Sequence, residues 1–487
     1  MSGRNEFSTF RVLICLVLGA AALSACARGG ETPTAAIPAE APKALGPQTA
    51  ASREHQRILE AYGGLYQDAR LEGFVAGVAN KLAKVSDRPD ITYRVTILNS
   101  PAINAFALPN GQLYVTRGLL ALANDTSELA AVLAHEMSHV VAKHGVQRAD
   151  QERQALLVSR VVTDVLENPD AGKVALAKSK IALASFSRSQ ELEADQIGVR
   201  TMARAGYDPY GAVRFLDSLS RQGQLKTDLT GARPSGEAVD FLSSHPSTPE
   251  RVELATAAAR QIGAPGVGAQ ERDAYLAAID LAVFGDDPEQ GFARGRKFVH
   301  PTLGFAFIAP EGFTFENASD SILGIAPDGR ALRLDSVRLE AGQTLESYLA
   351  SGWIEGAEVD AIESLTVNRL PAATVLAKGR DWTFRLVAIK LGEDVYRIIY
   401  AARTLTAATD EGFRASIESF RRIDAGEARA VRPLRLRIVT VRPGETPETL
   451  ARRMTGVDRP LERFLVLNGL RPGAALQPGQ QVKIVTE

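Results

Sequence analysis

The sequence predicts an α+β protein with three folded parts: a mainly helical domain with a small sheet, an antiparallel α+β domain, and a small strand–helix–helix–strand module. Helical periodicity dominates residues 53–285, and short alternating runs typical of antiparallel strands dominate residues 297–425. Residues 435–487 contain two helical stretches between strand-like ends. A chain of 487 residues is long enough for about three domains of this kind.

The N-terminal segment differs in character from the rest of the chain. Basic residues precede an apolar run over residues 12–25, which is shorter than the roughly 20 residues of a membrane-spanning helix. The run ends in Leu23-Ser24-Ala25-Cys26, which resembles the signal of bacterial lipoproteins. This resemblance implies a signal peptide over residues 1–25 and acylation of Cys26. The alternatives are an ordinary secretory peptide or a short uncleaved anchor.

The segment behind the cysteine predicts a flexible tether over residues 26–52, since it is rich in Ala, Pro, Gly and Thr and has no periodicity. Cys15 and Cys26 are the only cysteines, so the mature chain can form no internal disulfide. Ala27 stands where Asp would favour retention in the inner membrane of some bacteria. By resemblance we therefore expect anchoring at the outer membrane, facing the periplasm.

The most informative motif of the helical domain is His135-Glu136-x-x-His139, in a stretch with helical periodicity. Histidines at i and i+4 lie on one face of a helix, so both imidazoles can bind a single metal ion. The glutamate between them can activate a water held by that metal. Asp125 predicts the start of this helix as its N-cap, an apolar stripe predicts burial on one side, and Gly145 predicts its end.

A second helical stretch supplies candidates for a third ligand, which a catalytic zinc site requires in addition to a water. This stretch begins near Ser187 and ends at Gly206. Glu191 and Asp195 lie one turn apart, so one carboxylate can bind the metal while the other holds a ligand histidine. The residues alone do not decide between Glu191 and Glu193 as the ligand.

Together these motifs resemble peptidase family M48, which comprises zinc metallopeptidases such as the CAAX prenyl proteases and periplasmic protease-chaperones. The motifs that carry the resemblance are His135-Glu136-x-x-His139, Ser187-Arg188-x-x-Glu191-x-x-x-Asp195, Asn104-Ala105-Phe106-Ala107-Leu108-Pro109 and Ser244-His245-Pro246-x-x-x-x-Arg251. The resemblance covers residues 53–262. It implies one Zn²⁺ per chain, bound by His135, His139 and Glu191.

The resemblance also implies the chemistry of a zinc endopeptidase. Zinc lowers the pKa of its water to about 7 and polarises the scissile carbonyl. Glu136 then accepts the proton of the attacking water and passes it to the leaving amine. The strand that contains Asn104, Ala105 and Phe106 offers an edge to which an extended substrate could add. The alternative is a hairpin buried within the domain.

Two further residues of the motif have roles that the sequence leaves open. His245 could occupy the open position of the metal as an inhibitory latch, hydrogen-bond the oxyanion, or cap the helix that begins near Thr248. Arg251 could pair with a carboxylate such as Asp195 or stabilise the transition state. By contrast, His144 has no partner in the pattern, and we expect it to be a surface histidine at a helix end.

The segments that follow carry no recognisable catalytic pattern. Residues 221–239 are polar and without a period, which favours a mobile flap over the cleft. Residues 297–425 show no acid–base cluster, so we interpret this domain as a scaffold or docking module. The last residues resemble a LysM domain, a module that binds N-acetylglucosamine polymers such as peptidoglycan. Glu445 in place of the usual Asp, and Pro447 in the first helix, leave its glycan binding open.

We therefore expect a lipid-anchored endopeptidase of the bacterial cell envelope that acts on misfolded or misassembled envelope proteins. Peptidoglycan is a further expected partner, and the membrane is contacted only through the anchor. The net charge of −1, without a long basic run, indicates no nucleic-acid partner. The alternatives are a chaperone or assembly factor with a latched metal site and a cell-wall tethering protein. The intact Glu136 favours the enzyme, because no structural role requires a carboxylate there.

Overall fold

The computed structural model describes most of the chain from residue 50 onward. The described residues are 50–148, 150, 151, 154, 186–230, 241, 245, 248–317, 321–354 and 357–487. The expected signal peptide, almost all of the expected tether and Cys26 lie outside these residues. The described part contains no helix that is both long and apolar enough to cross a membrane.

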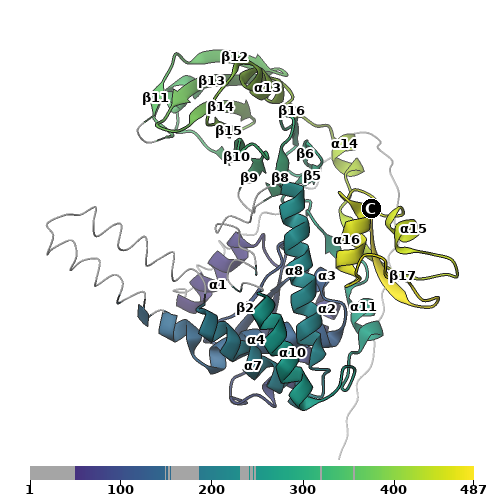
Figure 1. Ribbon diagram of the computed structural model, residues 1–487. Helices are drawn as coiled ribbons and strands as arrows, with labels where there is room; N and C mark the ends of the chain where they lie inside the picture. The colour runs from purple at the N-terminus through teal and green to yellow at the C-terminus, as the bar shows by residue number, and fades with distance from the viewer. Residues whose placement is uncertain are drawn as a thin grey trace, which may run out of the picture. The chain divides into compact units, whose positions relative to one another are not determined.

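The first part of the described chain is mainly helical, as predicted (Figure 1). Its helices are α1 (Ala50–Ala61), α2 (Ala69–Ala83), α3 (Arg117–Leu122), α4 (Thr126–Val141), α7 (Arg188–Arg204), α8 (Tyr210–Thr230), α10 (Pro249–Ile262) and α11 (Arg272–Ile279). A small sheet accompanies them in the order β1 (Arg94–Leu98), β3 (Gln112–Thr116), β2 (Ala105–Ala107). β2 pairs antiparallel with β3, and β1 runs parallel to β3. β2 therefore lies at an edge of this sheet.

Helix α4 carries the histidine motif and begins where the sequence predicts. Asp125 is its N-cap and accepts a hydrogen bond from the backbone N–H of Glu128 at 2.9 Å. The side chain of Glu128 accepts from the backbone N–H of Asn124 and not from that of Asp125, so no reciprocal capping box forms. The expected burial on one side is wrong, because every residue from Thr126 to His139 is buried. The helix passes through the middle of the domain.

The C-terminus of α4 lies earlier than predicted. The helix ends at Val141, and not at Gly145, because Lys143 adopts a left-handed conformation with φ of 58°. This conformation breaks the helical hydrogen-bond ladder and is unfavourable for a residue with a Cβ. A separate helical segment begins after this break, over residues 144–148.

Two glycines allow neighbouring helices to approach α4 closely. A Cβ on Gly198 of α7 would lie 3.2 Å from the backbone nitrogen of His135. A Cβ on Gly211 of α8 would lie 2.6 Å from the backbone of Ser127. Helix α8 also extends to Thr230, so the first half of the expected flap is wrong, and residues 231–239 lie outside the described part.

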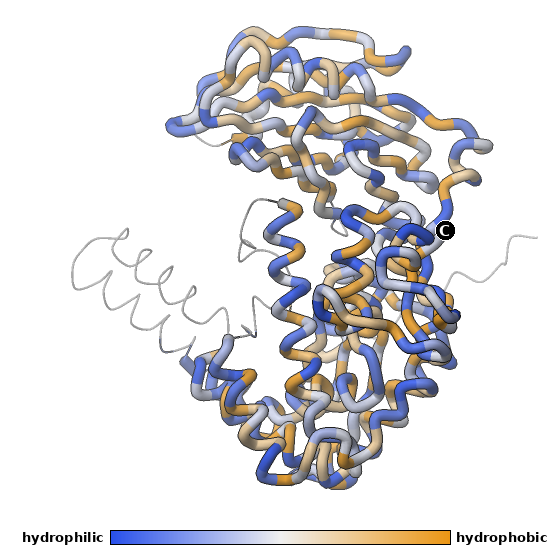
Figure 2. Tube along the Cα trace, turned by 45° about the vertical axis from the view of Figure 1, so that its right-hand side comes forward, coloured by the Kyte–Doolittle hydropathy of each residue, from blue (hydrophilic) through white to orange (hydrophobic). Residues whose placement is uncertain are grey.

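The second part is the predicted antiparallel α+β domain. Its strands are β5 (Phe292–Arg294), β6 (Lys297–His300), β7 (Phe305–Ile308), β8 (Thr314–Asn317), β9 (Ile322–Ile325), β10 (Ala331–Val337), β11 (Glu358–Val359), β12 (Glu363–Val367), β13 (Leu370–Lys378), β14 (Thr383–Leu391), β15 (Asp394–Ala402) and β16 (Arg421–Arg422), with helices α12 (Leu345–Ala350), α13 (Ala407–Glu418) and α14 (Ala425–Ala430). Eight of the strands form one sheet, and four form another in the order β16-β7-β6-β5. Hydrophobic and hydrophilic stretches alternate along the chain in Figure 2. Buried and more exposed residues alternate along the first part of β10, as one buried face requires.

The last part has the predicted order of strand, two helices and strand. It consists of β17 (Leu434–Thr440), α15 (Pro447–Ala451), α16 (Pro460–Leu467) and β18 (Gln481–Thr486). Pro447 fits as the first residue of α15, where its missing N–H has no helical partner to lose. β17 pairs with β18 on one side and with β4 (Val283–Phe284), a strand from before the α+β domain, on the other.

This module shares its core with the helical domain, which the sequence did not indicate. One continuous cluster of buried apolar side chains contains residues of both, among them Leu129, Leu436 and Phe464. Lys483 of β18 is fully buried. Its ammonium group donates to the carbonyls of Ala121, Leu122 and Ala123, at the end of α3, at 2.8, 3.2 and 2.7 Å.

Candidate metal centre

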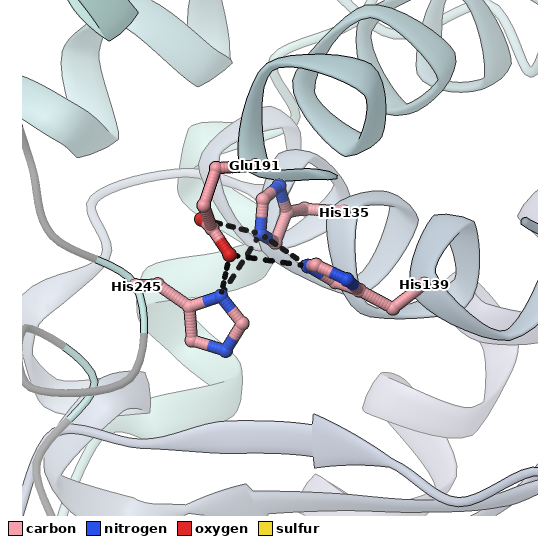
Figure 3. A group of neighbouring side chains, drawn as sticks. All are labelled: His135, His139, Glu191 and His245. Atoms are coloured by element: carbon pink, nitrogen blue, oxygen red, sulfur yellow. Dashed lines mark hydrogen bonds and ion pairs between the residues drawn. The ribbon is translucent and has the colours of Figure 1, made fainter. Parts of the chain in front are cut away.

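Four buried side chains converge beside α4. They are His135 and His139 from α4, Glu191 from α7, and His245, which precedes α10 in the chain. Their potential ligand atoms all lie within 4.8 Å of one another. Figure 3 shows the side chains pointing toward a common centre. The helix spacing places the two histidines on one face, and the capping box of Ser187 with Gln190 fixes the start of the helix that carries Glu191.

The donor atoms of this cluster fit a metal ion. The Nε2 atom of His135 lies 3.1 Å from Nε2 of His139 and 3.3 Å from Nδ1 of His245. Glu191 Oε1 lies 2.9 Å from the same His245 nitrogen and 3.6 Å from His139 Nε2. Three ring nitrogens and a carboxylate facing one point cannot all satisfy one another by hydrogen bonds. A set of imidazole and carboxylate ligands is the kind that holds Zn²⁺.

Burial and neighbouring charged groups shift the pKa values of the residues in the metal-free cluster. Burial by itself lowers the pKa of His135, but hydrogen bonds to Asp195 and Glu191 outweigh this effect and raise it to about 10. Burial and the neighbouring charges of His135 and His245 lower the pKa of His139. Burial favours the neutral form of Glu191, but its hydrogen bonds to His135 and His245 lower its pKa overall. A carboxylate and one cationic histidine therefore occupy the cluster when no metal is bound.

Asp195 and Arg251 hold the ligands in place. Asp195 lies one turn after Glu191 on α7, and its Oδ1 is 2.9 Å from Nδ1 of His135. Arg251 is buried and donates two hydrogen bonds to the carboxylate of Asp195, at 2.7 and 2.8 Å. Its Nη1 lies 2.9 Å from Oε2 of Glu191. The structure thus brings Arg251 onto both carboxylates, in a bidentate geometry that orients Asp195 toward the histidine.

Glu136 has the surroundings that a general base requires. It is 1% exposed, and burial raises its pKa above the ordinary range. Its Oε1 has no hydrogen-bond partner within the part of the chain that the structure describes, and His245 Nε2 lies 3.7 Å from it. A buried carboxylate oxygen without a partner is costly and therefore indicates a functional group or an absent water.

His144 is not a surface residue, so the expectation for it is wrong. The side chain is 1% exposed. Its Nδ1 lies 3.0 Å from Nδ1 of His139, and its Nε2 lies 3.2 Å from Oε2 of Glu193. The side chain of Glu193 is 59% exposed and points to His144, whereas Glu191 faces the cluster. The two glutamates that the sequence could not distinguish thus have different neighbours.

Two aromatic residues that the sequence analysis missed line the cluster. Phe186 stacks on the ring of His139 with 3.9 Å between ring centroids. Phe241 stacks on His245 at 4.5 Å, and its backbone N–H donates to the carbonyl of Ile103 at 2.8 Å. Neither residue has a diagnostic spacing from the metal motifs, so only the fold reveals them.

The strand expected to bind substrate, β2, is connected to this cluster through the contact between Ile103 and Phe241. Asn104 is buried and donates to the hydroxyl of Tyr62 at 2.7 Å, and Ala105 is also buried. Phe106 is half-buried and stacks on Tyr114 with 4.9 Å between centroids. The side chains therefore pack into the domain, while the strand itself lies at a sheet edge and immediately follows Ile103, the partner of Phe241.

Comparison with known proteins assigns the domains. Residues 67–259 match the model of peptidase family M48, and residues 439–485 match the LysM domain model. The chain is 30% identical over 231 residues to the beta-barrel assembly-enhancing protease of Escherichia coli, covering 45% of each chain. It is 31% identical over 180 residues to the mitochondrial metalloendopeptidase OMA1 of Schizosaccharomyces pombe, covering 37% of this chain and 50% of that protein.

A third relative is the putative beta-barrel assembly-enhancing protease of Vibrio cholerae, which is 25% identical over 313 residues and covers 61% of this chain and 63% of that one. The chain thus spans between 45 and 63% of the length of these curated relatives. The match to the family model includes both metal motifs, and M48 peptidases depend on a metal. Residues 67–259 therefore form a domain of peptidase family M48, and residues 439–485 form a LysM domain.

Proposed function

We propose that the chain is a zinc-dependent endopeptidase of the bacterial cell envelope. The observation that carries this proposal is the convergence of His135, His139 and Glu191 beside Glu136, a buried carboxylate whose Oε1 has no hydrogen-bond partner among the described residues. Structural packing gives no reason to bury such a carboxylate, whereas hydrolysis requires a base there. Relatives named as proteases and metalloendopeptidases support the same reaction class.

In the proposed mechanism the residues of the chain divide the work. A bound Zn²⁺ would act as a Lewis acid on the scissile carbonyl and would acidify the attacking water. Glu136 accepts the proton of that water and returns it to the leaving amine, and its burial keeps it basic enough for both steps. Asp195 holds His135 through Nδ1, and Arg251 holds Asp195 and Glu191, so the ligands keep their orientation.

For the substrates we propose unfolded or misassembled envelope proteins. An extended segment would add to the edge strand β2 around Asn104, Ala105 and Phe106 by backbone hydrogen bonds, which are available in any unfolded sequence. The names of the bacterial relatives refer to the assembly of β-barrel proteins, and this supports an envelope substrate.

His245 supports a second candidate function, a chaperone or assembly factor whose metal site is latched. Its Nδ1 lies among the ligand atoms, where a fourth protein ligand would displace the water. If His245 is a latch, the His245→Ala variant should cleave an unstructured substrate faster than the wild type. If His245 instead assists catalysis, the same variant should cleave more slowly than the wild type. The turnover of casein by both proteins separates the two roles.

We further propose that Cys26 is acylated and that the chain is anchored at the outer membrane, facing the periplasm. The lipoprotein-like Leu23-Ser24-Ala25 before the cysteine supports this. A Cys26→Ser protein should lose the mass of the acyl groups and leave the membrane fraction. Unchanged mass and fractionation would contradict the anchor.

For the LysM domain we propose peptidoglycan as ligand, which sedimentation with purified peptidoglycan tests directly.

Metal removal tests the proposed activity. A strong chelator should abolish the cleavage of casein, and dialysis against Zn²⁺ should restore it, because the ligand set lacks its cation in the stripped protein. Glu191→Ala should stay inactive after reloading and should contain less zinc. Glu193→Ala serves as the matched control on the same helix and should recover. Full zinc content in Glu191→Ala together with depletion in Glu193→Ala would overturn the ligand assignment.

A further inference from the structure

His144 occupies a position that the proposed chemistry does not use. It is 1% exposed and carries two polar ring atoms into the protein interior. One of them, Nδ1, lies 3.0 Å from Nδ1 of His139, and the other, Nε2, lies 3.2 Å from the carboxylate of Glu193. The opposite nitrogen of His139, Nε2, faces the cluster and lies 3.1 Å from Nε2 of His135. His139 therefore connects the cluster to His144.

The contacts permit one arrangement of protons among neutral rings. A neutral imidazole has one donor and one acceptor nitrogen. If Nε2 of His139 presents its lone pair to the cluster, the proton of His139 must sit on Nδ1 and can be donated to His144. His144 then accepts at Nδ1 and carries its own proton on Nε2, where the carboxylate of Glu193 accepts it. In this arrangement each ring nitrogen of His139 and His144 has a partner.

The backbone brings His144 to this place by an unfavourable turn. On a regular helix a residue five positions after His139 would point about 140° away from it. Lys143 instead adopts φ of 58°, which ends α4 and directs His144 back onto the helix. Phe186 stacks on the face of the His139 ring with 3.9 Å between centroids. The ring of His139 is thus held from its face by Phe186 and from its edge by His144.

The two histidines of the motif consequently have partners of different chemistry. His135 has the carboxylate of Asp195 at 2.9 Å from its Nδ1. His139 has the imidazole of His144 at 3.0 Å from its Nδ1, and His144 in turn contacts the largely exposed carboxylate of Glu193. Groups that accept the second N–H of a ligand histidine fix its tautomer and its orientation. The same property is therefore expected of His144.

We propose that His144 is a positioning residue for His139: it accepts the Nδ1–H of His139, selects the tautomer that presents Nε2 to the metal, and so raises the affinity of the site for zinc. This inference rests on the proposed function insofar as the cluster must bind a metal. Glu193 contributes little, since water can replace its exposed carboxylate as the acceptor of the His144 proton.

The test compares two substitutions of His144. In His144→Asn the amide oxygen can take the place of Nδ1 as an acceptor, whereas His144→Leu has a similar volume and no acceptor. Zinc affinity is measured by competition with a chromogenic chelator, and the visible spectrum of the Co²⁺-loaded protein reports the ligand geometry. Thermal unfolding of the metal-free proteins shows whether each variant folds. Glu193→Gln is the control outside the buried contact.

We expect His144→Leu to weaken zinc binding by about 10- to 100-fold and His144→Asn to restore most of it. Glu193→Gln should keep the affinity of the wild type. Wild-type affinity and an unchanged Co²⁺ spectrum in His144→Leu would overturn the positioning role. Equal losses in both His144 variants, with equally lowered melting temperatures before metal is added, would also overturn it in favour of packing alone. Failure of the wild type to bind zinc would instead overturn the proposed function.

Discussion

At the scale of single residues, the metal and a proton compete for His135. Its pKa of about 10 lies above the ordinary value of 6.5, so the ring is protonated at neutral pH when no metal is bound. It must lose this proton before it can act as a ligand. Zinc binding between pH 7 and 9 should therefore release about one proton, and the apparent affinity should rise about tenfold per pH unit. Calorimetry in two buffers of different ionisation enthalpy measures the release.

Asp195→Asn provides the comparison for this measurement. Its amide no longer stabilises the cationic ring, so fewer protons should be released at the same pH. Zinc binding that is independent of pH in the wild type would contradict the charge state assigned to His135.

Arg251 makes a second prediction at this scale, because it neutralises two buried carboxylates at once. Arg251→Met leaves Asp195 and Glu191 without this partner and should lower the free energy of unfolding of the metal-free protein by about 3–5 kcal/mol. Arg188 pairs with Glu250 between the same two helices, but its side chain is 76% exposed. Arg188→Met should therefore cost less than about 1 kcal/mol. Similar losses in the two variants by denaturant unfolding would refute this difference.

The residues of the site were predictable to the extent that helical spacing governs them. Spacing of i and i+4 indicates that His135 and His139 share a face, and it relates Glu191 to Asp195 in the same way. The same rule does not apply to His144, since the left-handed Lys143 lies between it and the helix. Nothing in the local sequence predicts this conformation for a lysine.

At the scale of elements, close packing against α4 depends on glycine. Gly211→Ala would bring a Cβ to 2.6 Å from the backbone of Ser127, and backbone atoms cannot move aside cheaply. We expect a loss of about 1–3 kcal/mol in the free energy of unfolding. Gly77 of α2 has open space around its Cβ position, so Gly77→Ala should be neutral or stabilise the helix by up to about 1 kcal/mol. Equal effects of the two alanines on chemical unfolding would contradict the packing argument.

Element boundaries were harder to predict than the elements themselves. The strands of residues 297–425 were predictable because alternation reports one buried face directly. The C-terminal half of α8 was taken for a flap because its composition is polar. Leu225 is nevertheless buried there, and Leu229 packs against the same core one turn later. Two apolar residues among many polar ones suffice to fix a helix on its neighbour, but they are too few for a clear period.

At the scale of the whole molecule, the LysM domain is part of the core of the peptidase domain. Besides the shared apolar core, Lys483 connects the two, since its ammonium group donates to carbonyls at the end of α3. The sequence could not predict this contact, since lysine is seldom fully buried and its partners lie about 360 residues earlier. The N-cap of α4 follows shortly after α3. The LysM domain therefore contacts the protein next to the start of the helix that carries the histidine motif.

Lys483→Met should therefore destabilise more than the LysM domain alone. Carbonyls that lose a buried donor cost about 1–3 kcal/mol, and we expect a melting temperature lowered in a single transition that includes the peptidase domain. Arg437→Met on the exposed face of β17 should change the stability by no more than about 0.5 kcal/mol. Separate transitions, with the peptidase transition unchanged in Lys483→Met, would show that the two domains fold independently.

We propose that the cluster is a hydrolytic centre in which Glu136 is the base. The most direct measurement is the rate of casein cleavage by wild type and Glu136→Gln, with the zinc content of both proteins determined in parallel. We expect equal zinc content and a rate in the variant lowered by at least about 100-fold, because the amide keeps the shape of the side chain but cannot accept a proton. Equal rates at equal zinc content would contradict it.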